Sequence, residues 1–284
     1  MNIKIVRQLI REYLLVEGVY DQNILKAVFM AGGPGSGKSY TAKLIFLADP
    51  DLANASATWS GLKLVNSDPA FERNLEKAGV SPGDLANLSD EEFEKMTVGP
   101  DSPRGRAKKT RDAAQRHYVD GRLGVVIDGT GDDYSKISAK KREMENLGYD
   151  TMMIFVNTSL EVAQERNAAR KRKLKPELVE EIWRDVQENM GAFQSLFGGN
   201  NFVIIDNTEY GPVSGAAQKA ISAFLKRPIE NAVGKKWIEQ ELKAKGPKAK
   251  RPKASRTGGG GSKAMRRMAS LAHPRQQSPG GEEQ

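Results

Sequence analysis

The sequence predicts an α/β fold of three layers, in which helices cover both faces of a five-stranded parallel sheet. Two observations carry this prediction: short runs of apolar and β-branched residues, and helical stretches that separate them. Runs that are apolar throughout are typical of parallel strands buried on both faces, and their alternation with helices is typical of βαβ units. The five runs are residues 26–31, 61–66, 123–128, 150–157 and 201–206.

The first run leads into a loop with the spacing of a phosphate-binding loop. Gly32 and Gly37 bracket four residues, and Lys38 and Ser39 follow. Glycines leave backbone N–H groups open to a polyphosphate, the lysine reaches the β- and γ-phosphates, and the serine hydroxyl ligates Mg²⁺ at a helix start. A flexible glycine turn is the alternative, but a strand before the loop and a helical stretch after it favour nucleotide binding. The predicted binding set is Gly32, Gly33, Pro34, Gly35, Ser36, Gly37, Lys38, Ser39 and Tyr40.

Composition limits the chemistry that the chain can perform. Its 284 residues contain no cysteine, and its two histidines are His117 and His273, so thiol catalysis is excluded and a histidine-based site is disfavoured. Catalysis must therefore rest on carboxylates, lysine, arginine and a metal ion. No apolar run approaches the roughly 20 residues that span a bilayer, and residues 1–20 carry charges throughout, so we expect a cytoplasmic protein without membrane contact.

Patterning along the chain predicts three parts. Residues 1–25 have apolar positions at helical spacing and predict an amphipathic helix that packs on the core, residues 26–234 form the α/β domain, and residues 235–284 form a basic tail. The tail carries a net charge of +9 and the whole chain +8, so the rest is nearly neutral. Its Lys, Pro and Gly content predicts disorder, and its charge makes nucleic acid a candidate partner.

Two segments of the α/β domain are expected to serve the site. Residues 69–118 are too many for one crossover helix and predict a helical insertion near an acceptor site. Lys108, Lys109 and Arg111 in this insertion either contact an anionic acceptor or form a solvated helix face, which the pattern slightly favours. Residues 161–176 join two helical stretches and predict a lid.

Two carboxylates follow predicted strands and are candidates for chemistry. Asp68 follows the second strand, at the sheet edge where α/β proteins bind ligands, and is our candidate base for an acceptor hydroxyl. Because Pro69 follows it, the alternative is a helix-capping role. Asp128 ends the third strand and is a candidate for orienting Mg²⁺ together with Ser39. The alternative for Asp128 is a turn residue before Gly129.

Arg166 and Arg170 lie four residues apart and therefore share one face of a helix. Either guanidinium can stabilise the negative charge that spreads over a transferred phosphoryl group. The alternative is a solvated basic face, since Lys171, Arg172 and Lys173 continue the run. We treat Arg166 and Arg170 as catalytic and the following basic residues as surface.

Taken together, these residues resemble the zeta-toxin and polynucleotide-kinase group of phosphate-loop kinases, and the chain looks like a phage-type member. The resemblance covers roughly residues 24–227 and depends on the glycine loop, Asp68, the strand ending in Asp128, and residues 165–170. It implies a phosphate-loop kinase fold with the strand order 2-3-1-4-5, a lid that bears arginines, and Mg²⁺-ATP as the phosphoryl donor. It also implies that Asp68 activates the acceptor while Arg166 and Arg170 clamp the transition state.

The sequence thus predicts an ATP-dependent kinase that phosphorylates a hydroxyl of a small molecule, nucleotide or nucleotide sugar. A 5′-hydroxyl polynucleotide kinase is the first alternative, although that branch has an arginine three residues after its aspartate where this chain has Phe71. A non-kinase ATPase that acts as a switch is the second. If the chain is phage-encoded, the host-cell cytoplasm is its expected location. The sequence identifies no protein partner.

Overall fold

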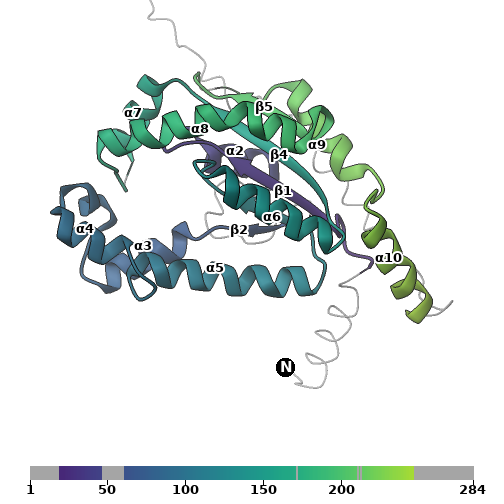
Figure 1. The fold of residues 1–284 in the computed structure, drawn as a ribbon. Helices are drawn as coiled ribbons and strands as arrows, with labels where there is room; N and C mark the ends of the chain where they lie inside the picture. Colours follow the sequence, from purple (N-terminus) through teal and green to yellow (C-terminus); the bar gives the residue numbers. More distant parts are fainter. Residues whose placement is uncertain (1–18, 47–60, 171, 210, 212, 246–284) are drawn as a thin grey trace, which may run out of the picture. The chain divides into compact units, whose positions relative to one another are not determined.

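The computed structural model of the chain describes residues 19–46, 61–170, 172–209, 211 and 213–245. At its centre is a five-stranded parallel sheet with the order β2-β3-β1-β4-β5, which confirms the predicted fold class and strand order (Figure 1). The strands are β1 (Lys26–Ala31), β2 (Lys63–Val65), β3 (Val125–Asp128), β4 (Asp150–Asn157) and β5 (Phe202–Asp206).

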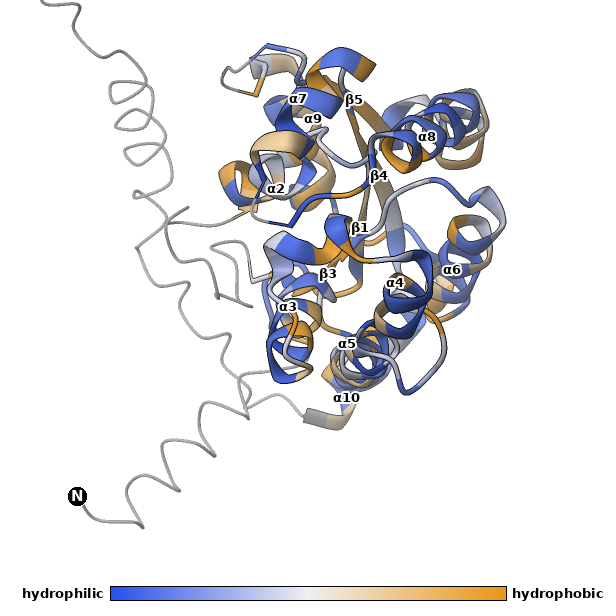
Figure 2. Cartoon of the chain, turned by 90° about the vertical axis from the view of Figure 1, so that its left-hand side faces the viewer, coloured by the Kyte–Doolittle hydropathy of each residue, from blue (hydrophilic) through white to orange (hydrophobic). Residues whose placement is uncertain are grey.

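Successive residues of the strands point into two separate apolar layers. In β1, Phe29 and Ala31 belong to one buried cluster, whereas Val28 and Met30 belong to the other. The sheet is therefore buried on both faces, which explains why its strands are apolar throughout. Figure 2 shows the hydrophobic colour on strands that lie between helices with hydrophilic outer faces.

Helices from different parts of the chain supply the two outer layers. The cluster around Phe29 receives apolar residues from α6 (Tyr134–Asn146), α8 (Pro176–Phe197) and α10 (Ala232–Lys245). The cluster around Val28 receives them from α2 (Lys38–Phe46) and α9 (Gly215–Lys226). Helix α7 (Leu160–Ala169) follows β4, and a 3₁₀ turn, η2 (Gly199–Asn201), precedes β5.

The segment between β2 and β3 is helical, as its sequence favours, and has a small core of its own. It contains α3 (Asp68–Lys77), a 3₁₀ helix η1 (Pro82–Asn87), α4 (Asp90–Thr97) and α5 (Pro103–Asp120). Phe71, Leu75, Leu85 and Ala107 form its buried cluster. Helix α4 begins with a capping box, in which the side chains of Ser89 and Glu92 each accept the other residue's backbone N–H.

Two of the expected segments lie largely outside the described residues: the N-terminal helix, of which residues 19–25 are described, and the tail beyond residue 245. Helix α10 runs through residue 235, where the sequence placed the start of the tail, and Trp237 and Ile238 pack against the core. Among the described residues, none of the helices has the length and apolar character of a membrane span.

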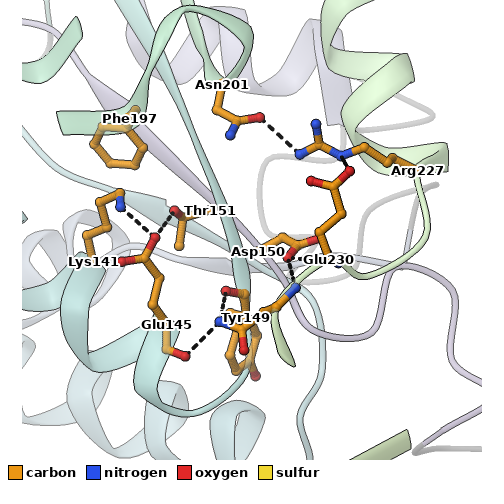
Figure 3. Close-up of a pocket in the computed structure, with 10 residues that line it drawn as sticks. Lys141, Glu145, Tyr149, Asp150, Thr151, Phe197, Asn201, Arg227 and Glu230 are labelled. Atoms are coloured by element: carbon orange, nitrogen blue, oxygen red, sulfur yellow. Dashed lines mark hydrogen bonds and ion pairs between the residues drawn. The ribbon is translucent and has the colours of Figure 1, made fainter. Parts of the chain in front are cut away.

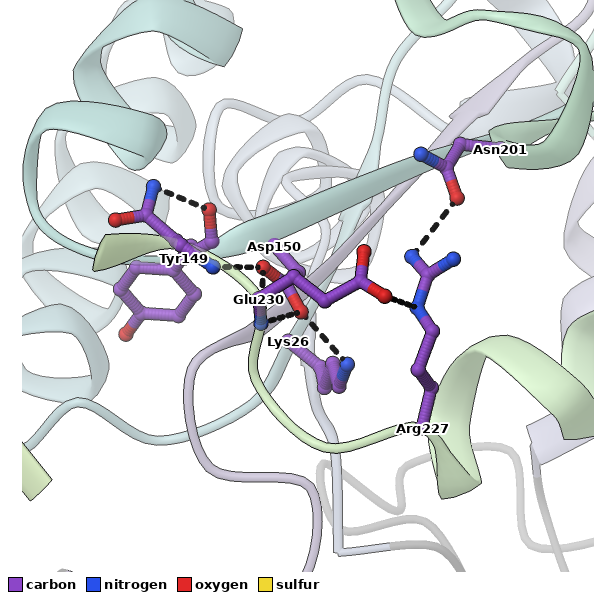
Figure 4. Close-up of polar contacts among 7 residues, drawn as sticks. Lys26, Tyr149, Asp150, Asn201, Arg227 and Glu230 are labelled. Carbon is purple, nitrogen blue, oxygen red and sulfur yellow. Dashed lines mark hydrogen bonds and ion pairs between the residues drawn. The ribbon is translucent and has the colours of Figure 1, made fainter. Parts of the chain in front are cut away.

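The amino-terminal edge of the sheet is closed by polar contacts around Asp150, the first residue of β4. Its carboxylate pairs with Lys26 Nζ at 2.9 Å and accepts the backbone N–H groups of Glu230 and Asn231 (Figure 4). A pocket of about 250 Å³ lies beside these contacts, and its charged side chains, such as Lys141 with Glu145 and Arg227 with Glu230, pair with one another (Figure 3). This edge holds the connection between α9 and α10 on the sheet.

Candidate active site

The loop from Gly32 to Ser39 joins the carboxyl end of β1 to α2. Gly35 and Gly37 have φ values of 77° and 78°, which side chains other than glycine rarely adopt. A Cβ atom at Gly35 would collide with the carbonyl group of Ala163, and one at Gly37 would collide with the side chain of Asn207. Glycine at these positions therefore allows both the turn and the close approach of α7 and of the segment after β5.

Asn207 and Arg166 hold this loop from the side of β5. Asn207 is buried and donates a hydrogen bond of 2.7 Å from Nδ2 to the carbonyl oxygen of Ser36. Arg166 donates to the carbonyl oxygens of Asn207 at 2.6 Å and Thr208 at 3.2 Å. Arg166 thus lies beside the glycine loop, and these two hydrogen bonds go to backbone carbonyl groups.

A continuous polar chain crosses the carboxyl edge of the sheet from the loop to α3. Lys38 Nζ lies 2.9 Å from Asp128 Oδ1, and Asn66 Nδ2 donates to Asp128 Oδ2 at 2.9 Å. The Asn66 side-chain oxygen accepts the backbone N–H of Asp68 at 2.7 Å. Three strands therefore contribute to one site, because Lys38 follows β1, Asp128 ends β3, and Asn66 and Asp68 follow β2.

The residues at this edge fit a divalent cation bound together with a polyphosphate. Asp128 has a side chain that is 7% exposed, and among the described residues its Oδ1 has no hydrogen-bond partner besides the ion pair with Lys38. Ser39 is exposed in the first turn of α2. Within the described residues there is no cluster of three or more metal-binding side chains. Magnesium in phosphate-transfer sites needs only one or two protein ligands, since phosphates and waters complete its shell.

Asp68 is held between two arginines that come from different segments. Arg104, in the first turn of α5, places Nη1 3.2 Å from Asp68 Oδ1, and Arg172, between α7 and α8, places Nη2 2.9 Å from Asp68 Oδ2. Both guanidinium groups also lie over the ring of Phe71, at 4.9 and 5.5 Å from its centroid. The insertion and the segment between α7 and α8 therefore meet at this carboxylate.

These cations determine the ionisation of Asp68. Burial raises the pKa of its carboxyl group, but the charges of Arg172, Arg104, Lys38 and Arg170 outweigh burial and hold the pKa below its ordinary value. Asp68 is therefore ionised at neutral pH. Asp68 is the first residue of α3, whose cap residue is Ser67, and the Ser67 side chain makes no capping hydrogen bond.

Arg172 corrects one sequence-based interpretation. We expected it to be a solvated surface residue, but its side chain is 11% exposed and pairs with Asp68 and Glu72. Arg170 directly follows α7 in extended backbone, so it does not share a helix face with Arg166 as the sequence predicted. It lies near the same carboxylates, and burial together with the charge of Arg172 lowers its pKa. Lys175, at the other end of this connection, pairs with Asp90 of the insertion at 2.6 Å.

The segment after α7 keeps its shape through Asn167. This buried side chain donates to the carbonyl oxygen of Leu174 at 2.8 Å and accepts its N–H at 3.0 Å. On the other side of the loop, Trp183 of α8 donates its indole N–H to the carbonyl oxygen of Thr158, and its Cα lies next to Gly33. The expected lid region thus packs against both the glycine loop and the insertion.

The sequence analysis missed Asn66, Asn207, Arg104 and Arg172. Asn66 and Asn207 had a usable signal, because each stands directly at the carboxyl end of a strand, where polar residues meet ligands. The two arginines had no such signal. Each lies within a run of basic residues, and the tertiary fold alone determines which member of the run turns inward.

Comparisons with known proteins give similar folds only. No protein-family model and no curated protein matches the chain. Similar solved structures include one from the PezAT chromosomal toxin-antitoxin system of Streptococcus pneumoniae (13% identity, TM-score 0.46, covering 86% of this chain and 98% of that one). Another is a gluconokinase from Sinorhizobium meliloti (15% identity, TM-score 0.39, covering 73% and 95%). A third is a chain of the Pnkp1/Rnl/Hen1 RNA repair complex (19% identity, TM-score 0.40, covering 60% and 46%).

The likeness is one of fold. It agrees with the resemblance to the zeta-toxin and polynucleotide-kinase group, but identities and TM-scores this low carry no argument about activity. The assignment of activity therefore depends on the side chains at the carboxyl edge of the sheet.

Proposed function

We propose that this protein is an ATP-dependent kinase that transfers the γ-phosphate to a hydroxyl group of a small molecule, nucleotide or nucleotide sugar. The observation that supports this most strongly is the polar chain from Lys38 through Asp128 and Asn66 to Asp68. It links a phosphate-binding loop at one end to an ionised carboxylate at the other. A phosphoryl donor and an acceptor bound at its two ends would lie side by side.

The glycine loop and its flanking residues serve the donor in this proposal. Backbone N–H groups of residues 32–40, except Pro34, bind the ATP phosphates, and Lys38 leaves Asp128 to contact the β- and γ-phosphates. Ser39 and Asp128 are the residues that would hold Mg²⁺, directly or through water. When bound, Mg²⁺ neutralises charge that develops between the β- and γ-phosphates. Arg166 keeps the loop in position and, with Arg170, stabilises the transferred group.

Asp68 serves the acceptor. Its ionised carboxylate accepts the hydrogen bond of the acceptor hydroxyl and then its proton, while the hydroxyl oxygen forms a bond to the γ-phosphorus and the bond to the β-phosphate oxygen breaks. Each carboxylate oxygen pairs with one arginine and has a second lone pair, so Asp68 can accept the acceptor hydroxyl while the arginines hold it in place. Arg172 can move from Asp68 toward the γ-phosphate, since it belongs to the lid segment.

The switch-ATPase alternative explains less of this site. A switch needs a positioned water and a segment that responds to hydrolysis, whereas it has no use for a carboxylate held by arginines from an insertion and a lid.

The polynucleotide-kinase alternative depends on the basic residues 246–284, which lie outside the described residues. Its test is a salt-dependent affinity for oligonucleotides that disappears when residues 246–284 are deleted, a boundary that leaves α10 intact.

The proposed activity is tested by transfer of labelled γ-phosphate from Mg²⁺-ATP to pooled acceptors. The pools contain sugars, nucleosides, nucleotides, nucleotide sugars and 5′-hydroxyl oligonucleotides. We expect a labelled product with the wild type and a loss of at least 100-fold in Lys38→Ala, about 3 kcal/mol of transition-state stabilisation. Lys43→Ala, one turn further along α2, is the matched control. ATP hydrolysis that depends on Lys38 without any labelled acceptor would favour the switch ATPase instead.

A further inference from the structure

We propose that Arg104 binds a phosphate group of the acceptor, so that the substrate class is phosphorylated molecules, such as nucleotides or sugar phosphates, and not neutral sugars or polyols. This inference rests on the proposed kinase function and extends it to the acceptor. It starts from the position of Arg104, which reaches Asp68 from the insertion, on a different segment from the glycine loop and the lid.

The guanidinium of Arg104 is prepared to bind an anion. Its side chain is 29% exposed, and its guanidinium carbon lies over the Phe71 ring, 4.9 Å from the centroid. Among the described residues, its one hydrogen bond is the Nη1 contact with Asp68. A guanidinium carries five N–H donors in a rigid fork that matches two oxygens of a phosphate. Most of these donors therefore remain for a ligand that lies next to Asp68.

The four cations around Asp68 outnumber the three carboxylates of the site, which are Asp68, Asp128 and Glu72. Arg104, Arg170, Arg172 and Lys38 act on this group, and Asp128 and Glu72 are the neighbouring carboxylates. Donor phosphates account for Lys38 and for the arginines of the lid segment. Arg104 belongs to the insertion and has no role in binding the donor. Arg104 pairs with Asp68 through one donor, so an acceptor phosphate beside Asp68 can take its other donors.

The same face of α5 continues this positive charge. Lys108 and Arg111 follow Arg104 at four and seven residues and share its side of the helix. Burial and repulsion by Arg104, Arg111 and Lys136 lower the pKa of Lys108, against the opposite effect of Asp112, which pairs with Arg111. Figure 2 shows α5 mostly in the hydrophilic colour. An anionic acceptor would relieve this repulsion.

The test compares acceptors that differ only by a phosphate: uridine with UMP, adenosine with AMP, and glucose with glucose 6-phosphate. For a phosphorylated acceptor, we expect Arg104→Gln to raise KM about 10- to 100-fold, as for loss of a charged hydrogen bond, and to leave the KM for ATP within about twofold. Arg106→Gln is the matched control, because Arg106 lies on the same helix and contacts the backbone of exposed Asp101. Arg104→Lys should restore part of the affinity.

A purely structural role for Arg104 predicts a different result. If Arg104 only keeps Asp68 ionised, Arg104→Gln lowers kcat equally for both members of each pair and leaves the acceptor KM unchanged. That result, or a preference of the wild type for neutral acceptors, overturns the proposal. Circular dichroism of each variant verifies the fold.

A binding experiment separates failure of this inference from failure of the proposed function. Wild type and Arg104→Gln are saturated with the non-hydrolysable β,γ-imido analogue of ATP and Mg²⁺, and are then titrated with UMP, AMP, glucose 6-phosphate or inorganic phosphate. Binding that weakens at least 10-fold in Arg104→Gln supports the phosphate subsite even if no phosphoryl transfer is found. Phosphoryl transfer to acceptors without any binding that depends on Arg104 supports the kinase and overturns the subsite.

Discussion

At the scale of single residues, the ionisation of Asp68 depends on cations that the fold brings from distant positions. Burial alone would raise the pKa of this carboxyl group, and the nearby arginines reverse the direction. The folded-state pKa is therefore below the unfolded value. This pairing contributes stability that is present above the unfolded pKa and is lost as the pH falls through the folded pKa.

Because the nearby arginines lower the pKa of Asp68, removing them should change the pH dependence of catalysis. Since Asp68 acts as a base only when it is ionised, the acid limb of kcat/KM reports its pKa in the free enzyme. In Arg172→Gln the carboxyl group loses its largest opposing charge, so we expect the acid limb to move to higher pH, and further in Arg104→Gln/Arg172→Gln. The measurement is kcat/KM against pH, with Arg184→Gln on the exposed side of α8 as the control. An unchanged midpoint in both variants would rule out Asp68 as the titrating base.

The sequence analysis named three residues of this site that follow strands, but it missed Asn66 and Asn207, which also follow strands, and the arginines that reach the site through tertiary contacts. Lys38, Asp68 and Asp128 are fixed by their positions at the ends of β1, β2 and β3, so their meeting follows from the parallel sheet. Arg104 and Arg172 lie about 70 residues apart, and their convergence on Asp68 depends on how the insertion packs beside the lid. Local sequence carries no information about that packing.

At the scale of elements, the glycine loop depends on close packing as much as on its own conformation. Gly35 has a positive φ, and its Cα faces the backbone of α7 so closely that no Cβ fits. The obstacle is a carbonyl group in a helix, which cannot turn away as a flexible side chain can. The loop and α7, which carries Arg166, must therefore move together if this contact is disturbed.

This contact predicts a severe effect of Gly35→Ala. We expect the variant to lose at least 10-fold in ATP affinity, because the loop must move away from α7 to accommodate the methyl group. Equilibrium binding of ATP measures this loss. Gly191→Ala is the matched control, since Gly191 lies in α8 with open space where a methyl group would stand, and alanine there should stabilise the helix by about 0.5–1 kcal/mol. Wild-type ATP affinity in Gly35→Ala would show that the packing is less tight than the contacts indicate.

The elements themselves were predictable to different degrees. The runs at 150–157 and 201–206 contain β4 and β5 almost residue for residue, because buried parallel strands are apolar throughout. The run at 61–66 is longer than β2, which has three residues, because Gly61 lies outside the paired register and Asn66 turns toward Asp128. A strand that ends in a functional side chain thus appears longer in sequence than it is in the sheet.

At the scale of the whole described domain, the carboxyl edge of the sheet carries the candidate active site, whereas the amino edge carries contacts that hold the fold together. The carboxyl edge gathers the charged groups of the candidate site, including Asp128 and Arg172. The amino edge gathers charged groups around the buried pair of Lys26 and Asp150, whose carboxylate also accepts the N–H groups of Glu230 and Asn231 (Figure 4). Stability and activity should therefore respond separately to substitutions at the two edges.

The buried pair of Lys26 and Asp150 provides the test of this separation. Their side chains are 2% and 7% exposed, and burial lowers the pKa of Lys26 despite the pairing with Asp150. Asp150→Asn can still accept the N–H groups of Glu230 and Asn231, but it leaves the ammonium of Lys26 without its counter-charge. We expect a loss of about 3–5 kcal/mol in the free energy of unfolding at pH 7, measured by urea denaturation. Because a buried neutral lysine is favoured over a buried ammonium, this loss should shrink as the pH rises toward the ordinary pKa of lysine.

Two comparisons make this prediction specific. In Lys26→Met/Asp150→Asn the unpaired charge is absent, so stability should recover most of the loss seen in Asp150→Asn alone. The exposed pair of Lys95 and Glu91 is the matched control, and Glu91→Gln should change stability by less than about 1 kcal/mol. Because the pair lies at the amino edge, the KM for ATP should stay near the wild-type value in every one of these variants at temperatures where they are folded. A large change in KM with intact folding would mean that the amino edge is coupled to the glycine loop through β1, which joins Lys26 to Gly32.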